Sequence, residues 1–348
     1  MGKKFDFVIG NPGYQKEAVG ANANDTPIYH YFYDAAFSVA DKVELITPAR
    51  FLFNAGGTPK DWNEKMLQDK HFKVKMYEQD SSRVFAGTTI TGGVVVTYRD
   101  AKKDFGAIEV FSPFDTLNAI VKKVSSKTDE SIMTIVSNRG LYKYSDIAYL
   151  EEPEEMKKTA DRRIAPSSFD RMPKLFQNEP NGKIEEFVRV YGSDGSQRVY
   201  KWLKRKYVEE VSNIDKYKVF ISKADGAAGT IGKPIPARIS GKPVVIEPGV
   251  IGTETFIAIG ETEDVNVANS ICNYIKTKFA RALLGVLKVT QNNAKPTWAK
   301  IPLQDFTTNS DINWNTSIKN IDKQLYKKYN FTAEEINFIE THVTEMEE

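Results

Sequence analysis

A short apolar run that ends in a turn constrains the fold of this chain most strongly. Residues 5–9 read FDFVI, and the segment Gly10–Tyr14 (GNPGY) follows at once. An apolar run of this length, stopped by glycine and proline, predicts a buried strand that ends in a tight loop. In an α/β sheet, ligands bind beside the carboxyl ends of the strands. A tyrosine closes this turn, which favours a functional loop over an ordinary turn built from Asn, Pro and Gly.

Helical and strand patterns alternate after this loop. Thr26 and Pro27 can begin a helix whose apolar side recurs at helical spacing as far as Ala40. Strand, helix, strand, helix and two further strands are the pattern of an α/β sheet that ends in a hairpin. The later predicted elements are strands at residues 43–47, 72–77 and 92–98 and a helix at residues 62–68.

The pattern divides the chain into four parts. Residues 1–100 carry the α/β pattern, and residues 101–135 predict a connector without a strong period. Residues 136–305 hold short strand-like segments with many turn signals and predict a mixed α/β domain. Residues 306–348 predict a helical tail. The predicted fold class is therefore α/β, with part of a sheet followed by a second, mixed α/β domain.

One helix in the second domain is well marked. Apolar residues from Ile271 to Val286 lie on one side of it, and the only cysteine, Cys272, is expected there as a small core residue. A single cysteine excludes a disulfide framework within the chain and fits the reducing cytoplasm. In the tail, Thr332 and Glu335 predict a capping box at the start of the last helix.

Charge is unevenly distributed, although the formal net charge is only +2. A basic run alternates with aromatic residues near position 200, whereas six glutamates and no lysine or arginine follow Thr332. This distribution indicates a surface for a polyanion, and a solvated helix face is the competing interpretation. The candidate phosphate-contacting residues are Arg198, Lys201, Lys204, Arg205 and Lys206, with Lys278 and Arg281 as weaker candidates.

Two classes of site are not expected from the sequence. No apolar run approaches the roughly 18–20 residues that span a bilayer, so we expect no membrane partner. His30, His71 and His342 are too scattered to predict a metal site.

The segment Asn11–Tyr14 (NPGY) resembles the catalytic motif of the NPPY-type adenine-N6 DNA methyltransferases of restriction–modification systems. In the branch it resembles most, the target-recognition domain follows the catalytic domain. The resemblance continues in the first hundred residues at Tyr31–Phe37, Leu45–Leu52 and Arg83–Gly87. Farther on, Thr253–Phe256, the helix at Asn269–Leu284, Thr290–Asn292, Trp298 and Ile301–Leu303 resemble type I-like DNA-recognition domains.

This resemblance implies part of a Rossmann-like methyltransferase sheet, a target-recognition domain and double-stranded DNA as partner. It also implies roles for single residues. The adenine N6 nitrogen is a poor nucleophile because its lone pair is delocalised into the ring, and acceptors for both N6 hydrogens would free that pair. The Asn11 side-chain oxygen and the Pro12 carbonyl are the expected acceptors. Tyr14 and Phe85 are expected to pack against the extruded base, and a core aromatic is the alternative for Phe85.

The chain departs from the family pattern in two places. Gly13 stands where the family has proline, which leaves the turn less rigid. In the family, the S-adenosylmethionine site is built from a glycine-rich strand–turn–helix and an acidic residue that precede this loop, and only ten residues precede Asn11. We therefore expect the cofactor site on a missing half, so that the chain is a fragment or has a second polypeptide as partner.

The expected function is a component of a site-specific DNA adenine-N6 methyltransferase that uses S-adenosylmethionine in the cytoplasm. Alone, the chain is expected to be inactive. Two alternatives stay open: a non-catalytic DNA-specificity subunit, and a methyltransferase that acts on RNA or protein.

Overall fold

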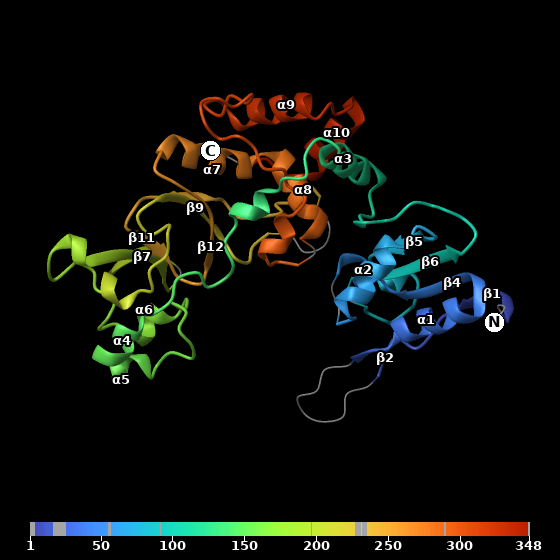
Figure 1. The fold of residues 1–348 in the computed structure, drawn as a ribbon, viewed down its shortest axis with the longest axis horizontal. Helices are drawn as coiled ribbons and strands as arrows, with labels where there is room; N and C mark the ends of the chain where they lie inside the picture. The colour runs from blue at the N-terminus through green and yellow to red at the C-terminus, as the bar shows by residue number, and fades with distance from the viewer. Residues whose placement is uncertain are drawn as a thin grey trace. The chain divides into compact units, whose positions relative to one another are not determined.

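The structure is a computed structural model that describes residues 4–16, 26–54, 57–90, 92–195, 197–226, 231, 235–288 and 290–346. The chain forms two compact units, Met1–Asn118 and Ala119–Glu348. Figure 1 shows them as a blue-to-cyan part and a green-to-red part. Sheets and helices occur in both units, so the predicted α/β fold class is confirmed. The four-part division at residues 100, 135 and 305 stays a prediction.

A four-stranded sheet of order β1-β4-β6-β5 forms the first unit. β1 runs parallel to β4, and β6 is antiparallel to both β4 and β5. Helix α1 connects the two parallel strands, which makes a βαβ unit, and β5 and β6 form the predicted final hairpin. The elements are β1 (Phe5–Gly10), β2 (Gln15–Lys16), β3 (Thr26–Pro27), α1 (Tyr29–Val39), β4 (Ala40–Pro48), η1 (Ala49–Phe53), α2 (Lys60–Gln68), β5 (Phe72–Glu78), η2 (Ser81–Arg83) and β6 (Val94–Asp100).

Aromatic side chains from the helices and the sheet fill the core of this unit. The ring of Phe51 is fully buried and lies 5.4 Å from the ring of Trp62 and 6.3 Å from that of Phe72. The buried hydroxyl of Tyr33 is hydrogen-bonded to Thr47 at 3.0 Å and to Thr97 at 2.7 Å. These two bonds tie α1 to adjacent strands, because a buried hydroxyl without partners would destabilise the fold.

The predicted start of the first helix is wrong. Thr26 and Pro27 form the short strand β3, which pairs with β2, and α1 begins at Tyr29. The backbone N–H of Ile28 donates to the carbonyl oxygen of Tyr14 at 3.0 Å. Pairing with the loop after β1 therefore extends this segment, so Thr26 does not cap the helix.

The second unit contains two three-stranded sheets, of order β10-β9-β12 and β11-β7-β8. Its strands are β7 (Phe187–Asp194), β8 (Gln197–Lys204), β9 (Tyr217–Ser222), β10 (Val244–Ile246), β11 (Val250–Gly252) and β12 (Phe256–Thr262). In Figure 1 helices α7 to α10 lie together, away from α4 to α6. The helices are α4 (Asp146–Glu151), α5 (Pro153–Met156), α6 (Ser168–Arg171), α7 (Val265–Lys276), α8 (Lys278–Leu287), α9 (Ile318–Lys328) and α10 (Ala333–His342); α3 (Asp115–Ser125) spans the boundary between the units. The single-turn 3-10 helices are η3 (Ile132–Ile135), η4 (Ile184–Glu186), η5 (Arg205–Tyr207) and η6 (Lys295–Trp298).

The single helix predicted at residues 269–284 is two helices. Thr277 is extended, and its side chain accepts a hydrogen bond from the backbone N–H of Ala280 at 3.1 Å. This capping bond ends α7 and starts α8, although the apolar side continues across the break. Cys272 is buried as predicted, and the capping box of Thr332 and Glu335 is present at the start of α10.

Neither a membrane span nor a metal cluster is found in the described part of the chain. No helix there is both long and apolar enough to cross a bilayer. Nor do three or more His, Cys, Asp or Glu side chains gather there as ligands for a metal ion.

We expect Phe51→Ala to lower the free energy of unfolding of the first unit by about 3–5 kcal/mol, because the cavity lies in a fully buried aromatic core. The control is Phe5→Ala, whose side chain is 58% exposed and should change stability by less than about 0.5 kcal/mol. Hydrogen exchange of the β4 and β6 amides reports on this unit alone. Equal losses for both variants would contradict the assignment of the core.

Candidate active site

The loop after β1 lines a cavity of about 440 Å³ at the carboxyl end of the parallel strand pair. Gly10, the last residue of β1, pairs with Leu45 of β4, so the segments that follow the two strands leave the sheet at the same edge. This is the edge at which α/β sheets bind ligands. The cavity is lined by Asn11, Pro12, Tyr14, Gln15, Pro27, Tyr29, Pro48, Arg50, Thr88, Thr89 and Ile90.

Phe85 lies next to Tyr14, which is one of the lining residues of this cavity. Their ring centroids are 6.4 Å apart, with an edge-on angle of 63°. Burial raises the pKa of Tyr14, so its phenol stays neutral near pH 7. The Tyr14 hydroxyl is buried and forms no hydrogen bond with the described residues. The structure thus brings together two aromatic residues that are 71 positions apart in the sequence, and their contact with a base stays a prediction.

The buried Ser81 holds the segment that carries Phe85. The Ser81 hydroxyl donates to the carbonyl oxygen of Thr88 at 2.9 Å and accepts from the N–H of Ile90 at 2.7 Å. The N–H of Phe85 donates to the carbonyl oxygen of Ser81 at 2.8 Å. One residue therefore holds both segments: its backbone carbonyl fixes Phe85, and its hydroxyl fixes the Thr88–Ile90 wall of the cavity.

Gly13 is not required by the backbone geometry of the loop. It does not have a positive φ, and a Cβ at this position would lie 3.6 Å from Ile28 and 3.9 Å from Phe32, which are ordinary contacts. The loop is held instead by the bond from the Ile28 N–H to the Tyr14 carbonyl. A residue with a Cβ would therefore fit at this position.

Most of the basic run near residue 200 lies on the strand β8, and Arg205 and Lys206 lie in the single 3-10 turn η5, so the solvated-helix interpretation of the run is wrong. Alternation along β8 sends its side chains to two faces of the sheet. Three cations of the run pair with carboxylates: Lys201 with Asp194, Arg205 with Glu210 and Asp215, and Lys206 with Glu151.

Arg198 and Lys204 differ from the other members of the run. Neither forms an ion pair within the described residues; Arg198 lies 4.9 Å from the ring of Phe256, and Lys204 lies 5.6 Å from the ring of Tyr207. DNA binding stays a prediction for all five cations, and the pairing makes Arg198 and Lys204 the more available two.

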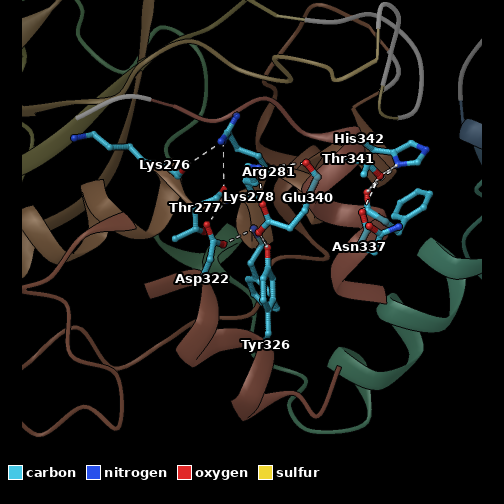
Figure 2. Close-up of polar contacts among 12 residues, drawn as sticks. Lys276, Thr277, Lys278, Arg281, Asp322, Tyr326, Asn337, Glu340, Thr341 and His342 are labelled. Atoms are coloured by element: carbon cyan, nitrogen blue, oxygen red, sulfur yellow. Dashed lines mark hydrogen bonds and ion pairs between the residues drawn. The ribbon is translucent and has the colours of Figure 1, made fainter. Parts of the chain in front are cut away.

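Lys278 and Arg281 lie in a packed helical region, which Figure 2 shows. The Lys278 ammonium pairs with Glu340 at 2.6 Å, and the Lys278 side chain is only 14% exposed. Arg281 is 1% exposed, its Nε donates to the carbonyl oxygens of Lys276 and Thr277, and burial lowers its pKa to about 10. These positions leave little surface for a phosphate.

Residues 1–85 match the family described as Eco57I restriction-modification methylase. This part of the chain is similar to a restriction–modification methylase. The match ends at Phe85 and therefore includes the whole Asn11–Tyr14 loop and both strands of the parallel pair. No curated protein matches the chain.

The solved structures similar to this chain include two restriction enzymes. The type IIG restriction endonuclease BpuSI shares 8% identity with a TM-score of 0.31, over 89% of this chain and 45% of that one. The type IIL restriction-modification enzyme MmeI, solved in complex with DNA, shares 10% identity with a TM-score of 0.38, over 97% of this chain and 57% of that one. This chain thus spans about half the length of each, and likeness at this level supports no inference about function.

Sequence reasoning missed several residues at the cavity. Arg50 and Tyr29 line it, and neither was among the predicted site residues. One signal could have found Arg50: it follows β4 as Asn11 follows β1, and parallel neighbours end at the same edge. No comparable signal marks Tyr29, Thr88 or Ser81, because their places depend on contacts across the loop.

We expect Gly93→Ala to destabilise the first unit more than Gly87→Ala. Both glycines have a positive φ, which costs an alanine about 1–2 kcal/mol. At Gly93 the added Cβ would also lie 2.3 Å from the carbonyl oxygen of Glu78, whereas Gly87 has nothing within 4 Å. The additional loss should be about 1–3 kcal/mol, measured by hydrogen exchange of the first unit. Losses of the same size would show that the Gly93 turn is not tightly packed.

Proposed function

We propose that this chain carries the adenine-binding loop of an S-adenosylmethionine-dependent DNA adenine-N6 methyltransferase of a restriction–modification system. The match of residues 1–85 to a restriction-modification methylase supports the reaction class. One observation carries the assignment to this loop: Asn11, Pro12 and Tyr14 line a single cavity beside Phe85, at the carboxyl end of β1. A cavity of about 440 Å³ is within the usual range for small-molecule sites, and a base extruded from duplex DNA is small enough to enter it.

The proposed chemistry depends on two neutral acceptors. The side-chain oxygen of Asn11 and the carbonyl oxygen of Pro12 accept the two hydrogens of the adenine N6 amino group. This withdraws the nitrogen lone pair from the ring and stabilises the positive charge that develops as N6 attacks. The neutral Tyr14 ring, with Phe85 edge-on beside it, holds the plane of the base.

The cavity does not supply a complete site for S-adenosylmethionine. Among the described lining residues Arg50 is the only charged one, and none of them is a carboxylate that could accept hydrogen bonds from ribose hydroxyls. The residues present therefore do not fit the whole cofactor. We propose that the cofactor site lies on a further segment or a second polypeptide.

The edge strand β1 is the proposed docking place for that cofactor-binding part. β1 pairs with β4 on one side only within the described residues. Phe5, Phe7 and Ile9 lie on one face of this strand, and they are 58%, 43% and 73% exposed. An edge strand with exposed apolar side chains is suited to receive another strand and the layer that packs on it. The cytoplasmic location expected from the sequence stays a prediction.

We expect Asn11→Ala to lower adenine-N6 methylation of duplex DNA by about 100-fold to 1,000-fold, the usual loss for one transition-state hydrogen-bond partner. Tyr14→Ala should lower it by about 5-fold to 150-fold, because one stacking contact is lost. Tyr31→Ala, on the exposed side of α1, is the control and should leave methylation unchanged. Methylation is measured with S-adenosylmethionine on the chain alone and with a polypeptide that carries the cofactor site.

Three outcomes would contradict this proposal. Wild-type rates for Asn11→Ala would show that the loop is not catalytic. Absence of methylation with the cofactor-binding polypeptide present would favour the DNA-specificity subunit. Methylation of RNA or protein in preference to duplex DNA would favour the other alternative.

The docking edge gives a separate prediction. We expect Phe7→Asp to weaken the association with the cofactor-binding polypeptide by at least about tenfold, since a desolvated unpaired carboxylate is costly at an interface. Met76→Asp is the matched control, because Met76 is also 43% exposed but lies on β5 at the other edge of the sheet. Association is measured by calorimetric titration. If both substitutions weakened the association equally, β1 would not be the docking edge.

A further inference from the structure

We propose that a cationic cluster in the second unit, formed by Arg139, Arg163 and Lys223 around Glu254, binds the phosphodiester backbone of duplex DNA. This inference rests on the proposed function, which supplies DNA as the partner. None of these three cations belongs to the basic run near residue 200.

A buried carboxylate holds the three cations in one place. Glu254 is 8% exposed, and its backbone N–H donates to the carbonyl oxygen of Ile164 at 2.7 Å. Its Oε1 accepts from Nε of Arg139 and from Nη1 of Arg163, the latter at 2.8 Å. Its Oε2 lies 3.9 Å from Nζ of Lys223. The cations come from three separate segments of the chain, so tertiary contacts alone bring them together.

Positive charge remains in excess at this cluster. Asp161 also pairs with Arg163, through contacts of 3.0 and 2.9 Å to its Nε, so three cations face two carboxylates. Burial lowers the pKa of Lys223. The Glu254 carboxylate acts in the opposite direction, and the guanidinium groups of Arg139 and Arg163 lower the pKa further. These like charges repel one another, and an additional anion would stabilise the arrangement.

The cations of the cluster remain accessible to a large ligand. The side chains of Arg139, Arg163 and Lys223 are 60%, 37% and 26% exposed. Glu254 engages only the Nε of Arg139, and the two terminal amino groups of Arg139 form no hydrogen bond with the described residues. The Arg139 guanidinium, fixed in this way, matches the two free oxygens of a phosphodiester.

Backbone contacts fix the segments that carry the two arginines. The N–H of Ser137 donates to the carbonyl oxygen of Ala258 in β12 at 2.8 Å, which anchors the segment before Arg139. Gly140 has a positive φ, and a Cβ there would lie 2.4 Å from Cδ of Arg163. Arg163 can therefore lie flat against this segment only because residue 140 is glycine.

Polar and cationic side chains extend the surface beside the cluster. The exposed segment Thr290–Asn292, which resembles part of a recognition domain, is fixed next to Lys223, because the N–H of Asn293 donates to the Lys223 carbonyl at 2.8 Å. Arg198 lies over Phe256, two residues after Glu254. Phosphate contacts thus have groups beside them that can reach base edges, as in protein–DNA interfaces generally.

A second basic surface competes with this assignment. Lys319, Lys323 and Lys327 are exposed and lie one helical turn apart on α9. No ion pair holds these lysines in place among the described residues, so they cost more side-chain entropy to order on a ligand. The Glu254 cluster is the better phosphate site because its cations are already positioned.

The experiment measures binding of a fluorescent 20-base-pair duplex to the full chain as a function of salt concentration. Each of the variants Arg139→Ala, Arg163→Ala and Lys223→Ala removes one phosphate contact. Each should therefore reduce the slope of log affinity against log salt concentration by about 1 and weaken binding about fivefold at 0.15 M salt. Arg162→Ala is the matched control, because Arg162 neighbours Arg163 but pairs with Asp146 and Glu209, and it should bind like wild type.

Thermal unfolding identifies variants that fail to fold. Arg139 is the most exposed of the three cations, so Arg139→Ala is the variant expected to keep the fold. Wild-type affinity for Arg139→Ala, or an equal loss for Arg162→Ala, would overturn the inference. A loss of duplex binding only in Lys319→Ala, Lys323→Ala and Lys327→Ala would also overturn it. So would a loss that the cluster variants show with duplex RNA but not with duplex DNA. Absence of duplex binding by wild type would instead contradict the proposed DNA partner, so the two failures are distinguishable.

Discussion

The parallel pairing of β1 with β4 is the constraint on which the candidate site depends. It brings the Asn11–Tyr14 loop and the segment that carries Arg50 to one edge of the sheet, although α1 separates them in the chain. The Tyr33 hydroxyl, bonded to Thr47 and Thr97, holds α1 against the sheet. If this pairing were lost, the cavity would lose the wall that Pro48 and Arg50 form, because only the pairing brings these residues next to the loop.

Buried polar groups position exposed functional groups in both units. In the first unit, the hydroxyl of Ser81 bonds the backbone of Thr88 and Ile90, which follow the Phe85 turn. In the second unit, the carboxylate of Glu254 gathers cations that would otherwise repel one another. Each group is fixed by bonds that water cannot easily replace, because buried polar groups are strongly bound to their partners.

The accuracy of the sequence predictions follows the range of the interactions behind them. The strand at 5–9 and the Thr332–Glu335 capping box depend on neighbours within a few residues, and the structure contains both. The predicted burial of that strand is wrong, because β1 lies at the edge of the sheet and Phe5, Phe7 and Ile9 are exposed. The start at Thr26 failed because pairing with Gln15–Lys16 competes with helix capping. The helix break at Thr277 was hidden, since the apolar period continues through it.

The sequence alone determined the α/β class, the loop after the first strand and the motif that resembles a methyltransferase, because these are written in local patterns. Tertiary structure alone decided which side chains share a site. It set Phe85 beside Tyr14, buried Arg281, and paired most of the basic run with carboxylates. It also gathered Arg139 and its partner cations around Glu254. The physical reason is that charge and aromatic character are visible in a sequence, whereas exposure and pairing depend on which distant segments fold against them.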